Sequence, residues 1–233
     1  MIELLWVDGT WAPRGGSPAS EALRRALDTR KVKFTYVNYP ADFGPATGMG
    51  DLSYEESKAI GAAALDRAVE ASPHLVVVGG YSQGAGVAVK YARDILPKRP
   101  RHQVLAVATL GDPHTPVHHG RSGIAGALHV PRPRFTEWAP GDPIADLPLG
   151  SPLRTVADLT GWMSVRTPEA ARVWAYRVAR NLPTKAQRWW EPWNWPAIAR
   201  AGEDIRNYLG TAHSTDYTGA LANRLARQIE SVA

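Results

Sequence analysis

The chain has 233 residues, of which 44% are hydrophobic and 21% charged, a composition that can bury a full core. The net charge is +5, but no dense run of Lys or Arg accompanies it, so we expect a solvated basic surface and no nucleic-acid partner. The absence of cysteine excludes disulfides and thiol chemistry, and no apolar run is long enough to span a bilayer.

The first part of the chain alternates apolar strands with helices. Residues 2–7 and 33–39 are typical of strands, and residues 20–27 between them are typical of a short helix. A capping box begins at Ser53 and opens a helix that we expect to run to about Ala71. The N-terminus lacks a basic leader and a cleavage site, so we expect synthesis in a cytoplasm without a signal peptide.

The alternation continues along the chain and predicts an α/β fold. Strands that are apolar throughout are typical of a mostly parallel sheet with helices on both faces. The remaining expected elements are strands at 75–78, 103–110 and 134–138, a helix at 85–96 and a final helix at 219–232.

The composition changes after residue 146, where the α/β pattern gives way to a helical one. We predict a catalytic core of residues 1–146 plus 211–233 and a helical, Trp-rich insertion of residues 147–210. Within the insertion we expect helices at 167–181, from residue 184 and at 196–209.

Tryptophans are concentrated in this insertion, most densely at Trp189, Trp190 and Trp193. They are either core residues between helices or an apolar rim for a long acyl chain or a lipid surface. The run is too dense, and too broken by prolines, to be core throughout. We therefore predict that these three tryptophans take part in substrate binding, as does Tyr81 beside the candidate nucleophile described next.

Gly80, Ser82 and Gly84 form the pattern Gly-x-Ser-x-Gly of serine esterases and lipases. An apolar strand precedes the pattern and a helical pattern follows it, as a nucleophile on a strand-to-helix turn requires. Small residues on both sides let the backbone pack closely around such a turn. We therefore predict Ser82 as the nucleophile; the alternative is a chance match in a glycine-rich loop.

A serine nucleophile needs a base, and the base needs an acceptor that orients it. His213 is the only histidine after His129 and precedes the last helix, where the hydrolase order of serine, acid and histidine places the base. A capping or surface role is the alternative. For the acid we favour Asp142, which directly follows a strand, whereas Asp112 comes early and suits a turn, and Asp146 suits helix capping.

Two backbone N–H groups are needed to stabilise an oxyanion. The first is the amide of Gln83, the residue after the nucleophile, and the second should come from a loop after an early strand. We predict Thr10 for this second position, and a plain turn after the first strand is the alternative. This chemistry requires no cofactor.

Three histidines with the ligand chemistry of a metal site lie close together in the sequence: His114, His118 and His119. No cysteine and no carboxylate at a suitable spacing accompanies them. We therefore predict that they belong to a solvated loop, and we assign no metal.

The motifs around the candidate nucleophile resemble those of the cutinase-like serine esterases. Residues 37–41 read Val-Asn-Tyr-Pro-Ala and residues 79–84 read Gly-Gly-Tyr-Ser-Gln-Gly, with a helix between them. Within this family the chain is most similar to the lysin B group, the mycolylarabinogalactan esterases of mycobacteriophages, because it lacks cysteines and carries a helical insertion between acid and histidine. The resemblance implies Ser82 as nucleophile, Asp142 as acid and His213 as base on an α/β-hydrolase core.

The same resemblance implies a function. The expected reaction is hydrolysis of the ester between mycolic acids and arabinogalactan, with a long-chain acyl ester as substrate and an envelope lipid surface as partner. We expect a monomer that is made in the host cytoplasm and acts at the bacterial cell envelope after release, promoting host lysis. The alternatives are a general lipase or cutinase-like carboxylesterase, and a non-catalytic module that binds the envelope.

Overall fold

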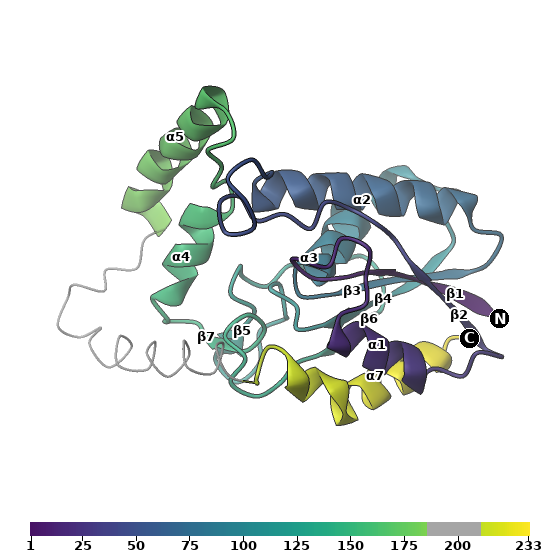
Figure 1. Cartoon of the computed structure of the whole chain (residues 1–233). Coiled ribbons are helices and arrows are strands. Elements are labelled where there is room, and N and C mark those ends of the chain that lie inside the picture. The colour runs from purple at the N-terminus through teal and green to yellow at the C-terminus, as the bar shows by residue number, and fades with distance from the viewer. Residues whose placement is uncertain (186–210) are drawn as a thin grey trace.

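A computed structural model describes residues 1–185 and 211–233, and a five-stranded sheet lies at its centre (Figure 1). The strand order is β2-β1-β3-β4-β6, and every neighbouring pair is parallel. This arrangement confirms the predicted α/β fold with a mostly parallel sheet. The strands are β1 (Ile2–Val7), β2 (Val32–Tyr36), β3 (Val76–Tyr81), β4 (Val104–Leu110) and β6 (Arg134–Glu137).

Helices cover both faces of the sheet (Figure 1). On one side lie α2 (Tyr54–Ala71) and α3 (Gln83–Lys90), and on the other lie α1 (Pro18–Ala26) and α7 (Ala220–Glu230). Two hydrophobic cores result, one on each side, which explains why the central strands are mostly apolar.

Strand β1 shows how one strand serves both cores. Leu4 and Trp6 pack with the residues of α1 and α7, while Leu5 and Val7 pack with those of α2 and α3. All four side chains are buried. Successive side chains of a strand point to opposite faces, so a strand covered on both faces has no polar face.

The helix ends follow local sequence signals. Ser53 accepts a hydrogen bond from the amide of Glu56 and the Glu56 carboxylate accepts one from the Ser53 amide, which confirms the predicted capping box of α2. Helix α1 begins earlier than predicted, because Ser17 is its N-cap and Pro18 its first residue. Beyond α3 the chain continues as a π-helical turn (Tyr91–Ile95) and a 3-10 turn (Leu96–Lys98), so the predicted helix at 85–96 is not regular throughout.

Two further helices, α4 (Leu153–Thr160) and α5 (Pro168–Lys185), pack against each other in the segment predicted to be an insertion. Figure 1 shows them beyond the carboxyl edge of the sheet. Helix α5 runs on to Lys185, so its predicted end near Asn181 was too early and residues 184–185 belong to it. The remainder of the helix predicted from residue 184, and the helix predicted at 196–209, lie outside the described residues.

A short antiparallel pair, β5 (Arg121–Ser122) and β7 (Leu147–Pro148), connects the core to this helical segment and was not predicted. Arg154 of α4 holds the pair, because its guanidinium donates to the carbonyl oxygens of Ser122 and Leu147 at 3.2 and 2.6 Å. The division of the chain at residues 146 and 211 stays a prediction.

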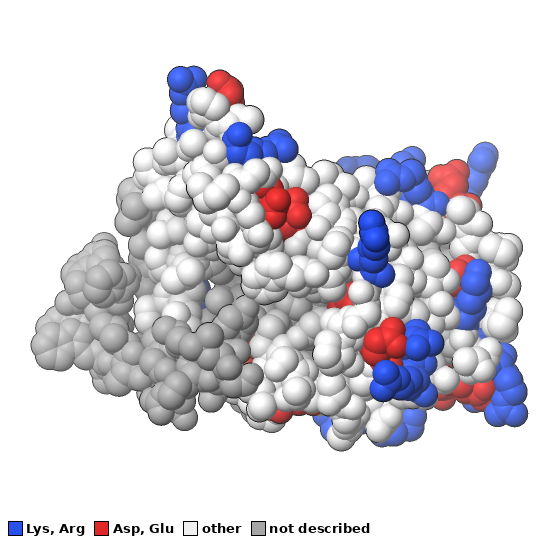
Figure 2. Space-filling model, in the orientation of Figure 1, with Lys and Arg blue, Asp and Glu red and all other residues white. Residues whose placement is uncertain are grey.

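The surface and the helices of the described residues bear on the partner predictions. On the face drawn in Figure 2, Lys and Arg stand in small separate groups, several beside Asp or Glu. Among the described helices, none combines the length and the hydrophobicity needed to cross a bilayer.

Candidate active site

Ser82 lies on a sharp turn between β3 and α3. Its backbone angles are φ 54° and ψ −120°, a conformation that L-residues rarely adopt. The Ser82 amide donates to the Leu110 carbonyl at 3.0 Å, and the Ser82 carbonyl accepts from the Gly86 amide at 3.2 Å. The turn therefore holds the serine at the carboxyl edge of the sheet and at the N-terminus of α3.

Three chain segments meet so closely at this turn that glycine is needed. A Cβ atom at Gly80 would lie 2.3 Å from the Gly84 carbonyl, and one at Gly84 would lie 2.0 Å from the Val7 oxygen. A Cβ at Gly9 would lie 3.3 Å from the Cβ of Ser82, so the loop after β1 also abuts the serine. The glycines of the motif thus serve packing between backbones.

We expect Gly84→Ala to lower the free energy of unfolding by about 3 kcal/mol or more, because the new methyl group overlaps the backbone of β1. Gly50→Ala is the matched control, since nothing lies within 4 Å of a Cβ at that position. Urea unfolding monitored by circular dichroism measures both variants. Equal midpoints for the two would contradict the close contact between α3 and β1.

The structure brings Ser82, His213 and Asp142 into one row. The Oγ atom of Ser82 lies 2.8 Å from Nε2 of His213, and Nδ1 of His213 lies 2.8 and 3.0 Å from the two carboxylate oxygens of Asp142. Asp142 is completely buried, and the His213 side chain is 11% exposed. The serine, the acid and the histidine come from the turn after β3, the loop after β6 and the loop before α7. In this row His213 can take the proton of Ser82 while Asp142 orients the imidazole.

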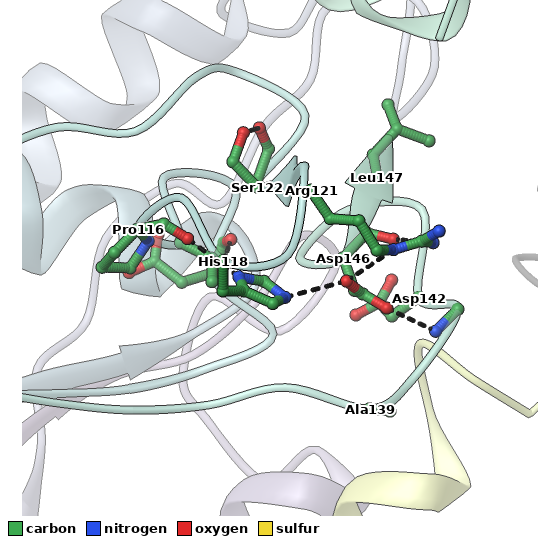
Figure 3. Close-up of polar contacts among 12 residues, drawn as sticks. Pro116, His118, Arg121, Ser122, Ala139, Asp142, Asp146 and Leu147 are labelled. Carbon is green, nitrogen blue, oxygen red and sulfur yellow. Dashed lines mark hydrogen bonds and ion pairs between the residues drawn. The ribbon is translucent and has the colours of Figure 1, made fainter. Parts of the chain in front are cut away.

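The other two candidate acids bind elsewhere. Asp112 pairs with Arg134 at 2.5 Å. The Asp146 carboxylate accepts from Arg121 at 2.7 Å and lies 2.9 Å from Nε2 of His118, and Figure 3 shows these two side chains converging on it. In the described part of the chain neither carboxylate contacts His213. The predicted helix-capping role of Asp146 was wrong: its second oxygen accepts from the Gly141 amide at 2.8 Å, so it braces the loop that carries Asp142.

Two tyrosines hold the row, and the sequence pointed to only one of them. The Tyr81 hydroxyl donates to the backbone carbonyl of His213, and its ring stacks on the imidazole with centroids 5.5 Å apart. The Tyr217 hydroxyl donates to Oδ2 of Asp142 at 2.5 Å. Tyr81 was predicted as a substrate contact and is buried here. Tyr217 follows His213 by four residues, and that proximity was the available signal.

The predicted oxyanion residues lie beside the serine. The Thr10 hydroxyl donates to Oε1 of Gln83 at 2.9 Å, and Nε2 of Gln83 donates to the Asp42 carbonyl at 2.8 Å. The Gln83 side chain thereby connects the loop after β1 with the loop after β2. Within the described residues, neither the Thr10 amide nor the Gln83 amide donates a hydrogen bond. Both N–H groups can therefore donate to the oxyanion of the reaction intermediate.

An open depression of about 530 Å³ adjoins this loop and is lined by residues 11–17. Trp11 has a left-handed backbone conformation, with φ 66°, and is 65% exposed. Its amide donates to the Ala41 carbonyl at 3.3 Å, which fixes the Trp11 backbone next to the predicted oxyanion residue Thr10. The other predicted contacts, Trp189, Trp190 and Trp193, lie outside the described residues.

The predicted histidine cluster separates into different environments. His114 is buried and its Nδ1 lies 2.9 Å from the Gly126 carbonyl, so the expected solvated position is wrong for this residue. His118 packs on the Trp138 ring with centroids 4.2 Å apart and pairs with Asp146. The described residues contain no group of three or more side chains suited to hold a metal ion.

The buried His114 should make stability depend on pH. Burial, reinforced by the charge of Lys58, lowers the pKa of His114 from 6.5 to about 4. Below pH 6.5 the unfolded chain binds a proton on His114, whereas the folded protein does not bind it until about pH 4. The free energy of unfolding therefore decreases by on the order of 3 kcal/mol as the pH is lowered from 6.5 to 4.

Unfolding by urea at a series of pH values measures this dependence. His114→Asn keeps a donor for the Gly126 carbonyl and should flatten the profile between pH 4 and 6.5. His129→Asn, at an exposed position, is the control and should keep the slope of the wild type. A wild-type profile that is already flat in this window would show that His114 binds its proton equally well in both states.

The parallel sheet between two layers of helices, with a serine on the turn after its central strand in line with a histidine and an aspartate, defines an α/β hydrolase. The sequence matches the cutinase family over residues 8–146, which is more than half of the chain. The chain therefore belongs to the cutinase family.

Two relatives show how far the similarity extends. Esterase PE16 of Mycobacterium tuberculosis is 39% identical over 126 residues, which cover 48% of this chain and 23% of PE16, so the chain spans less than a quarter of that relative. The crystal structure of lysin B from Mycobacteriophage D29 superposes with a TM-score of 0.57 and 21% sequence identity, and the match covers 91% of each chain. The second likeness confirms the fold and extends beyond the range of the family match.

Proposed function

We propose that the protein is a serine esterase, with Ser82 as nucleophile, His213 as general base and Asp142 as the acid that orients it. The observation that carries this proposal is the row from Ser82 Oγ through His213 to the buried Asp142 carboxylate, with both distances at 2.8 Å. Membership of the cutinase family and the match to Esterase PE16 support the same class of reaction.

The reaction proceeds in two halves. Ser82 Oγ attacks the ester carbonyl and gives its proton to Nε2 of His213, while the amides of Gln83 and Thr10 receive the negative charge on the carbonyl oxygen. The intermediate collapses when His213 protonates the leaving alcohol, which leaves the acyl group on Ser82. Water then gives a proton to His213 and attacks the acyl-enzyme, and the free acid departs with the Ser82 oxygen reprotonated.

For the substrate we propose the ester that joins mycolic acids to arabinogalactan in the mycobacterial outer envelope. The motif resemblance to the lysin B group and the shared fold with the phage D29 lysin B support this choice. The proposed enzyme is a monomer that acts at the envelope after release from the host cytoplasm and promotes lysis. A general carboxylesterase is the second candidate, since the sequence match to Esterase PE16 favours no particular ester.

Mass spectrometry of purified mycolyl-arabinogalactan after incubation with the protein tests the substrate. Free mycolic acids should appear with the wild type and be absent with Ser82→Ala. A triglyceride of matched acyl length, assayed in parallel, separates the candidates. Faster hydrolysis of the triglyceride, with no mycolic acid released, would support the general carboxylesterase.

A fluorophosphonate probe tests the chemistry independently of the substrate. Covalent labelling of Ser82 in the wild type, located by peptide mapping, would exclude the non-catalytic envelope-binding module. Binding to cell-wall material without any labelling would support that module and contradict the esterase.

A further inference from the structure

Tyr217 lies against the candidate acid at the core of the protein. It belongs to the short 3-10 turn η4 (Thr215–Thr218) between His213 and α7, and its side chain is completely buried. Its hydroxyl donates to Oδ2 of Asp142 at 2.5 Å and accepts from the amide of Ala139 at 3.1 Å. Because the Ala139 N–H can only donate, the single phenol proton is directed at the carboxylate.

The carboxylate is thereby held from both sides. Oδ1 of Asp142 accepts from the Ile144 amide at 2.9 Å, Oδ2 accepts from Tyr217, and Nδ1 of His213 lies against both oxygens. A buried carboxylate stays ionised only when donors replace the water it has lost. Tyr217 supplies the one side-chain hydroxyl among these donors in the described residues.

The packing around the phenol leaves it little freedom. Gly111, at φ 57°, faces both rings: a Cβ there would lie 3.2 Å from Cζ of Tyr217 and 3.3 Å from Cε1 of His213. The Tyr81 ring lies 5.7 Å from the Tyr217 ring. Burial and the nearby Asp142 charge raise the pKa of Tyr217 well above its ordinary value, so the phenol keeps its proton throughout the working range of an esterase.

We propose that Tyr217 is a positioning residue of the esterase: its phenol aims the Asp142 carboxylate at Nδ1 of His213 and, by donating to Oδ2, limits how strongly that carboxylate attracts the imidazolium proton. The proposal rests on the proposed function of the row. A donor on a carboxylate lowers its basicity. Without the phenol, Asp142 holds the imidazolium proton more strongly and orients the ring less well.

Few other charges act at this place. The titratable groups that face the pair in the described structure are Tyr81 at the end of β3, His213 before η4 and Asp146 in the loop after β6. The Asp146 charge is already compensated by Arg121 and His118. A change at Tyr217 should therefore reach His213 through Asp142.

Tyr217→Phe tests the proposal in the full chain, with a p-nitrophenyl acyl ester as substrate. We expect kcat to fall about 10- to 100-fold, the usual effect of one hydrogen bond to a charged group, with KM within about twofold. The acid limb of the kcat/KM profile should move to higher pH. Tyr91→Phe is the matched control: Tyr91 is also completely buried and its hydroxyl lies 2.8 Å from Nδ1 of His102, remote from Ser82.

The control separates a specific effect from a loss of packing. Tyr91→Phe should lower the unfolding midpoint but leave kcat and the acid limb unchanged. If Tyr217→Phe behaves in the same way, or lowers kcat with an unmoved acid limb, Tyr217 has a structural role only and the proposal is wrong. If the wild type itself does not hydrolyse the ester, the proposed function fails instead, so the two failures are distinguishable.

Fluorinated tyrosine at position 217 keeps the hydrogen bond and the size of the ring, which protects the test against a variant that does not fold. Fluorination makes the phenol a stronger donor to Asp142. The acid limb should then move to lower pH, opposite to Tyr217→Phe, and move further with a second fluorine. An acid limb that stays at the wild-type position for both analogues would overturn the proposal.

Discussion

Ser82→Ala should lower kcat/KM for a p-nitrophenyl acyl ester by about 10⁶-fold, the size of the effect when a serine nucleophile is removed. The Ser82 Oγ forms the covalent bond to the acyl group. A water molecule in its place is not held in position for the attack, and its proton is not held against His213 as the Oγ proton is. The loss should appear in kcat. Rates measured at saturating ester, with the concentration of folded protein fixed by circular dichroism, give the comparison.

The fold should survive this change, because the one side-chain hydrogen bond of Ser82 recorded in the described structure is that to His213. Ser231→Ala is the control: this exposed serine follows α7 and its hydroxyl donates to the Gln228 carbonyl at 2.7 Å. It should keep turnover within about twofold, as surface substitutions usually do. Wild-type turnover in Ser82→Ala would remove Ser82 from the mechanism and with it the proposed esterase.

The sequence predicted those features of the fold that residues close together in the chain determine. Strand β1 was predicted with its observed bounds because five of its six residues are apolar, and the N-terminus of α2 because Ser53 and Glu56 cap it together. The turn at Ser82 was predictable for the same reason, since the glycines that permit it lie within two residues. Each of these features needs only a local pattern.

The ion pairs around the three aspartates were not predictable. Asp112 meets Arg134 and Asp146 meets Arg121 across loops whose path depends on the whole sheet edge. All three aspartates follow strand-like segments, and Asp142 was favoured as the acid because it directly follows a strand. The sequence could not show which carboxylate the fold places against His213, because that depends on the path of the loops.

The end of α3 shows a different limit. The predicted helix at 85–96 was a regular one ended by Pro97, whereas the structure widens into a π-helical turn at Tyr91–Ile95. Pro97 has no N–H for the Arg93 carbonyl, and its ring would clash with that oxygen in an α-helix, so the last turns open. Pro97 correctly marks the end of the helix, but the geometry of the last helical turns depends on packing.

The burial of His114 was also beyond the sequence. Histidine in a loop with glycines and prolines is usually solvated, and the residue carries no sign of its partner. The loop folds back so that the Gly126 carbonyl reaches Nδ1 of His114, twelve residues earlier in the chain. A contact of this kind arises from the tertiary path of the loop, which no periodicity encodes.

Asp142→Asn should lower kcat/KM by about 10⁴-fold near neutral pH while the chain stays folded. The Asn side chain has one oxygen and one amide, but the site presents three donors, from Ile144, Tyr217 and His213. If the amide turns toward His213, Nδ1 must accept and the proton moves to Nε2. The imidazole then has no lone pair for the Ser82 proton.

Asp216→Asn is the matched control, because it removes the same charge from an exposed position three residues after His213. It should leave kcat/KM within about twofold, which separates the orienting contact from the general field of a nearby carboxylate. Fluorophosphonate labelling of Ser82 should slow in parallel with ester hydrolysis in Asp142→Asn, since both reactions need the deprotonated Oγ. If Asp142→Asn retained wild-type rates, the acid would have to be sought elsewhere, although Asp112 and Asp146 are both bound to arginines in this structure.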